Sequence, residues 1–267
     1  MKKISKNRQL DQFYTKRSVA IECYEELNNY VDIRNCFLVE PSAGSGSFSN
    51  LFHSNSIAMD LDPKNKNIKK CDYLEFNYEI ELKEKKDIVV IGNPPFGKNS
   101  SLAVSFFNKS AEYSDVIAFV VPKTFKKESL MNRLSLDFHL KYSKDMEKDS
   151  FIFNDEKYDV PCVFQIWMKE KKPREKVKNK KTSHLFEFVT KDNADFAVRR
   201  VGGLAGKVLE DFRQYQPSSH YYIKAIKNKN ELILLLKSKY DELQIESNNT
   251  AGNPSLSKTE LIKILES

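Results

Sequence analysis

Glycine, cysteine and histidine are scarce in this chain, and long apolar runs are missing. The 267 residues include eight glycines, four cysteines and four histidines. No two cysteines form a CxxC pair and no histidines form an HExxH motif, so we expect neither a disulfide framework nor a protein-bound metal. No apolar stretch approaches the roughly 18–20 residues of a membrane span, and the first residues lack the apolar core of a signal peptide. We therefore expect a soluble, cytoplasmic protein with no membrane partner.

The composition supplies a core and an excess of positive charge. Hydrophobic residues make up 40% and aromatic residues 12% of the chain, which excludes disorder throughout and fits one or two domains. The net charge is +7, and the segment 169–181 alone carries eight basic and two acidic residues. Such a run is typical of a segment that binds a polyanion such as nucleic acid, or of a solvated linker. Charge alone does not decide between these two interpretations.

The first two-thirds of the chain alternates helical and strand-like patterns. Apolar residues four apart predict a helix over 18–31, and a second helix is expected near 100–113. Runs of strand length follow at 36–40, 56–60, 87–92, 115–122 and 163–167. The last run alternates in polarity and predicts a half-buried strand, whereas 87–92 and 115–122 read as strands buried on both faces. This order predicts an α/β domain with a mostly parallel sheet.

The pattern changes after the basic run. Short strand-like pieces occur within 184–228, a helix is expected over 231–244, and a capping box from Ser257 to Glu260 opens a short terminal helix. The predicted organisation is therefore a catalytic domain at 1–172, a basic linker at 173–183 and a smaller domain at 184–267.

The first glycine pair follows a strand that ends in an acid, in the segment VEPSAGSGSF. Gly44-x-Gly46 is the turn that doubly wound sheets use beside a nucleotide, and Gly-x-Gly also serves as a plain turn. Asp60, at the end of the next strand, can accept hydrogen bonds from both ribose hydroxyls. No phosphate-binding lysine follows the loop, and Glu40 and Ser42 offer acceptors. The pocket suits a positively charged nucleoside better than a polyphosphate.

The segment IGNPPFG carries the most specific chemistry in the sequence. Pro94 and Pro95 fix two φ angles directly after a strand and make the loop stiff. The side-chain oxygen of Asn93 and the carbonyl of Pro94 can accept both hydrogens of one NH₂ group, and Phe96 offers a ring for stacking on a planar substrate. Two fixed acceptors stabilise the positive charge that develops on the nitrogen of an aromatic amine when it attacks an electrophile. We therefore expect Asn93, Pro94, Pro95 and Phe96 to form a catalytic loop.

Taken in order, these motifs resemble those of the S-adenosylmethionine-dependent amino-methyltransferases. The resemblance covers residues 9–170 and rests on QFYT at 12–15, EPSAGSGSF at 40–48, Asp60, CDYLEF at 71–76 and NPPF at 93–96. The order is that of DNA adenine methyltransferases of the gamma arrangement, in which a target-recognition region follows the catalytic domain. The resemblance implies a doubly wound, mostly parallel, seven-stranded sheet of the Rossmann-like class I methyltransferase type.

The resemblance also implies roles for particular residues. Asn93 is expected at the cofactor as well as at the target amine. Asp60 is expected to hold the cofactor's ribose and Asp72 its adenine amine, with Tyr73 and Phe48 packing nearby. The methionine end and sulfonium are expected to contact Gln12, Phe13, Tyr14, Thr15, Glu40, Pro41, Ser42, Ala43, Gly44 and Gly46.

Two further sets of residues are expected to contact the nucleic acid. Phe153, with Phe151 in reserve, is the candidate for the second aromatic that closes over the target base; core packing is the alternative for both. Arg199, Arg200 and Lys207 flank the GGLAG turn and are candidates for phosphate or guanine contacts, or else belong to a surface hairpin.

The substrate class is less specified than the chemistry. A base inside a duplex must be flipped out to reach the loop, and the appended C-terminal region favours DNA adenine as the target. NPPF also occurs in RNA-modifying relatives, so an RNA adenine methyltransferase is the alternative, with cytosine amines and protein glutamine as minor ones. A catalytically silent nucleic-acid-binding subunit is a third class.

Overall fold

The computed structural model describes residues 14–153, 156–158 and 160–267, and these divide between Lys176 and Val177 into two units. The first unit is built on a seven-stranded sheet in the order β4-β3-β2-β5-β6-β10-β7. Its strands are β2 (Phe37–Glu40), β3 (Ser56–Asp60), β4 (Lys69–Lys70), β5 (Ile88–Gly92), β6 (Val116–Pro122), β7 (Phe138–Asp145) and β10 (Cys162–Lys169). The pairs from β4 to β6 are parallel, and β10 runs antiparallel to both β6 and β7.

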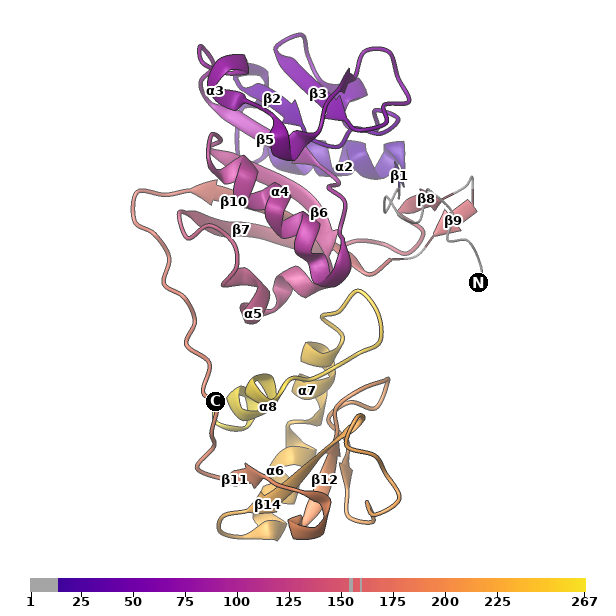
Figure 1. The fold of residues 1–267 in the computed structure, drawn as a ribbon, viewed down its shortest axis with the longest axis vertical. Helices are drawn as coiled ribbons and strands as arrows, with labels where there is room; N and C mark the ends of the chain where they lie inside the picture. The colour runs from indigo at the N-terminus through magenta and orange to yellow at the C-terminus, as the bar shows by residue number, and fades with distance from the viewer. Residues whose placement is uncertain (1–13, 154–155, 159) are drawn as a thin grey trace. The chain divides into compact units, whose positions relative to one another are not determined.

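Helices cover both faces of this sheet (Figure 1). Helix α2 (Arg17–Asn28) buries Ala20, Cys23 and Leu27 against one face. Helix α4 (Ser101–Ala111) packs on the other face, where the short helices α3 (Tyr78–Glu81) and α5 (Glu128–Met131) also lie. The predicted doubly wound, mostly parallel, seven-stranded α/β sheet is confirmed.

One strand differs from its predicted environment. β10 was expected to be half-buried because its sequence alternates, yet its first six residues are buried on both faces. The polar member of the alternation, Gln165, can be fully buried because its neighbours form hydrogen bonds with its side-chain amide. It accepts a hydrogen bond from Trp167 Nε1 at 3.0 Å and donates one to Ser143 Oγ at 3.3 Å.

A small second sheet lies beside the first. It has the order β1-β8-β9, with β1 (Tyr14–Thr15), β8 (Phe151–Phe153) and β9 (Glu156–Tyr158). β1 pairs antiparallel with β8, so that Tyr14 lies opposite Ile152 and Thr15 opposite Phe151. The pairing with β8 therefore fixes the position of Tyr14 and Thr15, the last two residues of the QFYT motif.

The segment that follows β10 begins as part of the first unit. Arg174 donates its Nε hydrogen to the carbonyl of Phe138 at 3.1 Å, and its Nη2 reaches the carbonyl of Leu134 at 3.1 Å. Its guanidinium also lies 5.7 Å from the Trp167 ring. Arg174 is thus bound within the fold of the first unit, whereas the lysines of the run 169–181 are exposed.

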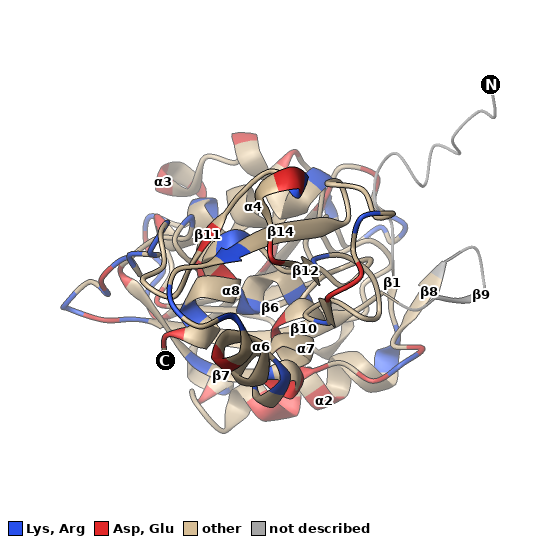
Figure 2. Ribbon diagram, turned by 90° about the horizontal axis from the view of Figure 1, so that it is seen from below, with Lys and Arg blue, Asp and Glu red and all other residues tan. Residues whose placement is uncertain are grey.

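The second unit packs three helices on a four-stranded antiparallel sheet. The sheet has the order β11-β14-β12-β13, with β11 (Phe186–Phe188), β12 (Phe196–Arg199), β13 (Val208–Leu209) and β14 (His220–Ala225). The helices are α6 (Lys229–Ser238), α7 (Tyr240–Ser247) and α8 (Lys258–Leu265); α6 contains residues of both signs of charge (Figure 2). The single helix predicted over 231–244 is two helices, because the helical backbone is interrupted at Lys239. The predicted capping box from Ser257 to Glu260 is confirmed.

Candidate active site

A cavity of about 220 Å³ opens at the carboxyl edge of the sheet. It lies where β2, β3 and β5 end, at Glu40, Asp60 and Gly92. Its wall comes from residues 14–15, 40–44, 47–48, 60–61, 71–74, 93, 95, 102 and 106. The cavity therefore joins the glycine loop to Asn93, as a site that binds a nucleoside beside the NPPF loop requires.

The glycine loop lies under the ring of Tyr14. Gly44 adopts a φ of +53°, and a Cβ there would stand 2.6 Å from Tyr14 Cε1. Ser47 also donates its hydroxyl hydrogen to the carbonyl of Thr15 at 2.6 Å. Only glycine combines this backbone angle with so close a contact, so β1 forms a cover over the loop.

Asp60 ties the end of β3 to the same loop. Its Oδ2 accepts a hydrogen bond from the backbone amide of Gly44 at 2.7 Å, and its Oδ1 accepts one from the amide of Asp62 at 2.8 Å. Both oxygens are thus oriented by backbone donors while the residue lines the cavity. A carboxylate fixed in this way has lone pairs left to accept hydroxyl hydrogens from a ligand.

Glu40 is the most deeply buried acid of the cavity wall, with only 2% of its surface exposed. Its Oε2 accepts a hydrogen bond from the amide of Ser49 at 2.8 Å. Burial, and to a lesser extent the negative charge of Asp60, raises the pKa of Glu40 to about 8, although the hydrogen bonds from Ser49 oppose this shift. A positively charged ligand beside this carboxyl would favour its ionised form.

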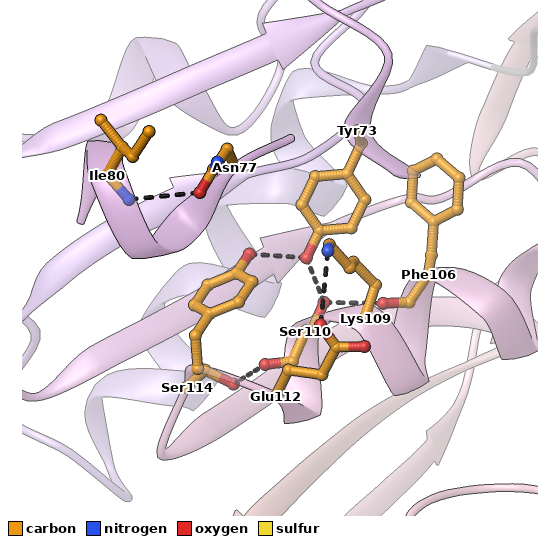
Figure 3. A network of polar contacts seen from close by, with 9 residues as sticks. Tyr73, Asn77, Ile80, Phe106, Lys109, Ser110, Glu112 and Ser114 are labelled. Carbon is orange, nitrogen blue, oxygen red and sulfur yellow. Dashed lines mark hydrogen bonds and ion pairs between the residues drawn. The ribbon is translucent and has the colours of Figure 1, made fainter. Parts of the chain in front are cut away.

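The opposite wall contains Asp72 and Tyr73. Asp72 accepts a hydrogen bond from the amide of Leu74 at 3.0 Å. The hydroxyl of Tyr73 hydrogen-bonds to Ser110 Oγ at 2.7 Å and to the hydroxyl of Tyr113 at 2.5 Å, as Figure 3 shows for the Ser110 contact. This network of α4 and the residues after it fixes the Tyr73 ring in the wall, and burial raises the pKa of both tyrosines.

The NPPF loop is fastened to the glycine loop. Ser42 donates its hydroxyl hydrogen to the backbone carbonyl of Asn93 at 3.0 Å, and Asn93 and Pro95 line the cavity. The amides of Leu102 and Ala103 both donate to the carbonyl of Phe96, at 3.2 and 3.3 Å, so the first turn of α4 holds the other end of the loop.

Some predicted residues lie elsewhere. Gly46 and Pro94 are not in the cavity wall, and Gly46 instead closes the turn by donating to the carbonyl of Ala43 at 2.7 Å. Phe96 is only 9% exposed and packs in the core with Phe48. Its predicted stacking on a base therefore needs the ring to become accessible.

Three predicted positions fall outside what the structure describes, namely Gln12, Phe13 and the side chain of Phe153. The reserve candidate, Phe151, is 1% exposed and belongs to the core, as the packing interpretation proposed.

The arginines predicted to contact nucleic acid are partly used within the second unit. Arg199 donates its Nε hydrogen to the carbonyl of Val201 at 3.0 Å, and the guanidinium of Arg200 lies 5.0 Å from the ring of Tyr221. Both are half-buried, whereas Lys207 is exposed. Of the three, Lys207 is the one whose side chain is available without rearrangement.

Sequence reasoning missed part of the cavity wall. The residues that it did not single out are Ser47, Leu61, Cys71, Leu74, Leu102 and Phe106. Leu61 and Cys71 directly follow or precede predicted site acids, so proximity in the sequence could have found them. Leu102 and Phe106 come from α4 and reach the cavity only through the fold.

Within the described ranges, no group of three or more His, Cys, Asp or Glu side chains is arranged to hold a metal ion. A search of the same residues finds no helix that is long and apolar enough to cross a membrane.

Comparisons with known proteins give remote structural similarities. No protein-family model matches the chain, and no curated protein matches its sequence. Similar solved structures include a candidate RNA methyltransferase from Pyrococcus horikoshii, at 18% identity and a TM-score of 0.42 over 60% of this chain and 87% of that one. A candidate methyltransferase from Escherichia coli aligns at 12% identity and a TM-score of 0.33, over 57% and 86% of the two chains.

The type IIL restriction-modification enzyme MmeI, solved in complex with DNA, aligns at 12% identity and a TM-score of 0.38. That alignment covers 86% of this chain and 51% of MmeI. These similarities are remote, and the function of the cavity has to be argued from its own residues.

Proposed function

We propose that this protein transfers a methyl group from S-adenosylmethionine to the exocyclic amine of a nucleic-acid base, with adenine in DNA as the target. The observation that carries the proposal is one continuous cavity whose wall includes both Gly44 and Asn93, at the carboxyl edge of the sheet. In open α/β sheets, ligands bind at this edge. The cavity brings a site for a nucleoside cofactor next to a stiff loop of acceptors.

The donors and acceptors of the cavity fit this cofactor. Its acids are Glu40, Asp60 and Asp72, and the described residues of the wall include no lysine or arginine. Glu40 suits the ammonium and sulfonium groups of the cofactor, Asp60 its ribose diol and Asp72 its adenine amine. The negative charge of these acids would repel a polyphosphate. When bound, S-adenosylmethionine supplies an electrophilic methyl group on a positively charged sulfur.

The chain's own part in the reaction is to hold and orient the amine. Asn93 and Pro94 supply oxygens that accept the two hydrogens of the NH₂ group and stabilise the charge that develops on nitrogen. The loop needs no strong base to do so, because attack is promoted by geometry and electrostatics. The hydrogen bond from Ser42 to the carbonyl of Asn93 keeps this residue beside the cofactor site.

The remaining assignments complete the proposal. The first unit is the catalytic domain, and the second is the target-recognition domain, with Arg199, Arg200 and Lys207 as its contacts. Phe96 and Phe153 stack on the flipped base. Gln12 and Phe13, like Tyr14 and Thr15, contact the methionine end of the cofactor.

The test is incubation of the purified protein with methyl-labelled S-adenosylmethionine and either duplex DNA or structured RNA, followed by nucleoside analysis. We expect label in N6-methyladenine from DNA. Label only in RNA would replace the DNA assignment by the RNA alternative. Label in neither polymer, with no binding of S-adenosylmethionine by calorimetry, would support a silent binding subunit and contradict the proposal.

A further inference from the structure

Two lysines and one aspartate form a fixed basic group beside the NPPF loop. The 3-10 helix η5 (Lys123–Lys126) directly follows β6. The Nζ atoms of Lys123 and Lys126 both reach the carboxylate of Asp145, at 2.8 and 2.5 Å. The two lysine side chains are only 24% and 31% exposed. Two ammonium groups therefore share one carboxylate and leave one positive charge in excess at a defined place.

This group lies at the same edge of the sheet as the NPPF loop. β5 and β6 are adjacent and parallel, with Gly92 paired to Phe119, so the segments that follow them leave the sheet side by side. A hydrogen bond of 2.8 Å joins Ser100 Oγ to Thr124 Oγ1. The segment after NPPF is thereby attached to η5.

The charges on the two sides of the NPPF loop have opposite signs. The cofactor side carries Glu40, Asp60 and Asp72 in the cavity wall. The other side adds two exposed cations to the lysine pair: Lys98, which directly follows the loop, and Arg133, whose Nη1 donates to the carbonyl of Asn99 at 3.2 Å. A cationic ligand is favoured on one side of the loop and a polyanion on the other.

We propose that Lys123 and Lys126 bind backbone phosphates of the nucleic-acid strand next to the target base. The inference depends on the proposed function for its substrate class and adds a phosphate-binding subsite within the catalytic unit. Asp145 neutralises only one of the two ammonium groups, so a net positive charge is left to attract a phosphate. The contacts offset part of the few kcal/mol that base flipping costs.

The chain offers a matched control at the opposite edge of the sheet. Lys83 and Lys86 are exposed in the segment before β5, at its amino end. The test compares Lys123→Ala/Lys126→Ala with Lys83→Ala/Lys86→Ala in the full-length protein. Affinity for a fluorescent oligonucleotide, duplex or single-stranded, is measured by anisotropy between 50 and 300 mM salt, with S-adenosylhomocysteine present.

We expect the first double variant to bind about tenfold more weakly, and the slope of log K against log salt to fall by about 1–2, since each phosphate contact contributes about 0.7–0.9. The control variant should stay within about twofold of the wild type. Equal losses in both variants, or an unchanged slope in the first, would overturn the subsite.

Asp145→Asn is a second variant with the opposite expected sign. Removal of the competing carboxylate should tighten oligonucleotide binding, whereas a purely structural role of the cluster predicts weaker binding. If Lys123→Ala/Lys126→Ala also loses affinity for S-adenosylhomocysteine, that double variant is misfolded. Asp145→Asn then tests the phosphate-binding subsite in its place. A wild type that methylates nucleic acid while all three variants bind like it contradicts the subsite alone. A wild type that methylates no nucleic acid contradicts the proposed function.

Discussion

The ring of Tyr14 lies against Gly44 so closely that a Cβ at position 44 would stand 2.6 Å from its Cε1. Two segments thirty residues apart thus close over one end of the cavity. β8 holds Tyr14 in place by pairing with β1. The size of residue 44 therefore controls whether the cover can close.

Gly44→Ala should abolish this arrangement. Alanine at a φ of +53° costs roughly 1–2 kcal/mol, and its methyl group would displace the Tyr14 ring. We expect at least a tenfold loss of affinity for S-adenosylhomocysteine in calorimetry. Gly252→Ala is the control, because nothing lies within 4 Å of a Cβ there. Equal affinity of Gly44→Ala and wild type would show that the cover takes no part in binding.

Cofactor affinity should depend on pH through Glu40. Burial raises the pKa of this carboxyl to about 8, so the free protein holds it protonated at neutral pH. A cation bound beside it favours the carboxylate, so binding releases a proton, and affinity rises with pH and levels off above about pH 8. Calorimetry of S-adenosylmethionine in buffers of different ionisation enthalpy measures this proton release. Glu40→Gln should bind more weakly and without release; the same proton release in that variant would place its source elsewhere.

Glu266 should stabilise the second unit in a pH-dependent way. Its side chain is 4% exposed and accepts hydrogen bonds from Lys180 Nζ, Ser183 Oγ and the amide of His184 at 2.7–3.0 Å. The bond from Lys180 is the largest cause that lowers the pKa of Glu266 to about 2. This stabilisation is fully present above about pH 4.5 and is lost as the pH falls toward 2.

Glu266→Gln should therefore lower the free energy of unfolding by about 1–2 kcal/mol at pH 7. Amide protection of α8 by hydrogen exchange measures the effect, and Glu187→Gln at an exposed position is the control. The difference between wild type and variant should shrink as the pH falls below 4. A difference that stays constant down to pH 2.5 would exclude the carboxylate as its origin.

The strands around the site could be predicted because apolar runs of strand length are unambiguous between turn signals. β2, β3, β5 and β6 lie within one residue of their predicted bounds. β14 was not singled out within the strand-like region 184–228, because in HYYIKA the aromatic residues give no clear alternation, although four of its six residues are buried. The burial of Gln165 was not predicted either, since only the folded sheet places Trp167 and Ser143 beside it.

The candidate site could be predicted where its residues lie in motifs at strand ends. Glu40, Asp60 and Asn93 all line the cavity as expected. The contribution of α4 could not be predicted, since Phe106 reaches the cavity only because the helix packs across the sheet. The burial of Phe96 also depends on long-range packing, here against a core that includes Phe48 and Phe151. The sequence motifs therefore predict the polar side chains of the cavity wall. Its apolar side chains depend on how the helices and strands pack.

The most direct test of the account is methyl transfer by Asn93→Ala. The variant should transfer label from S-adenosylmethionine to nucleic acid at least a hundredfold more slowly, because an acceptor at the developing charge is lost. Transfer is compared at saturating S-adenosylmethionine because Asn93 also lines the cofactor cavity, and Asn67→Ala, at an exposed position, should behave like the wild type. Undiminished transfer by Asn93→Ala would contradict the claim that this residue holds the amine during the reaction.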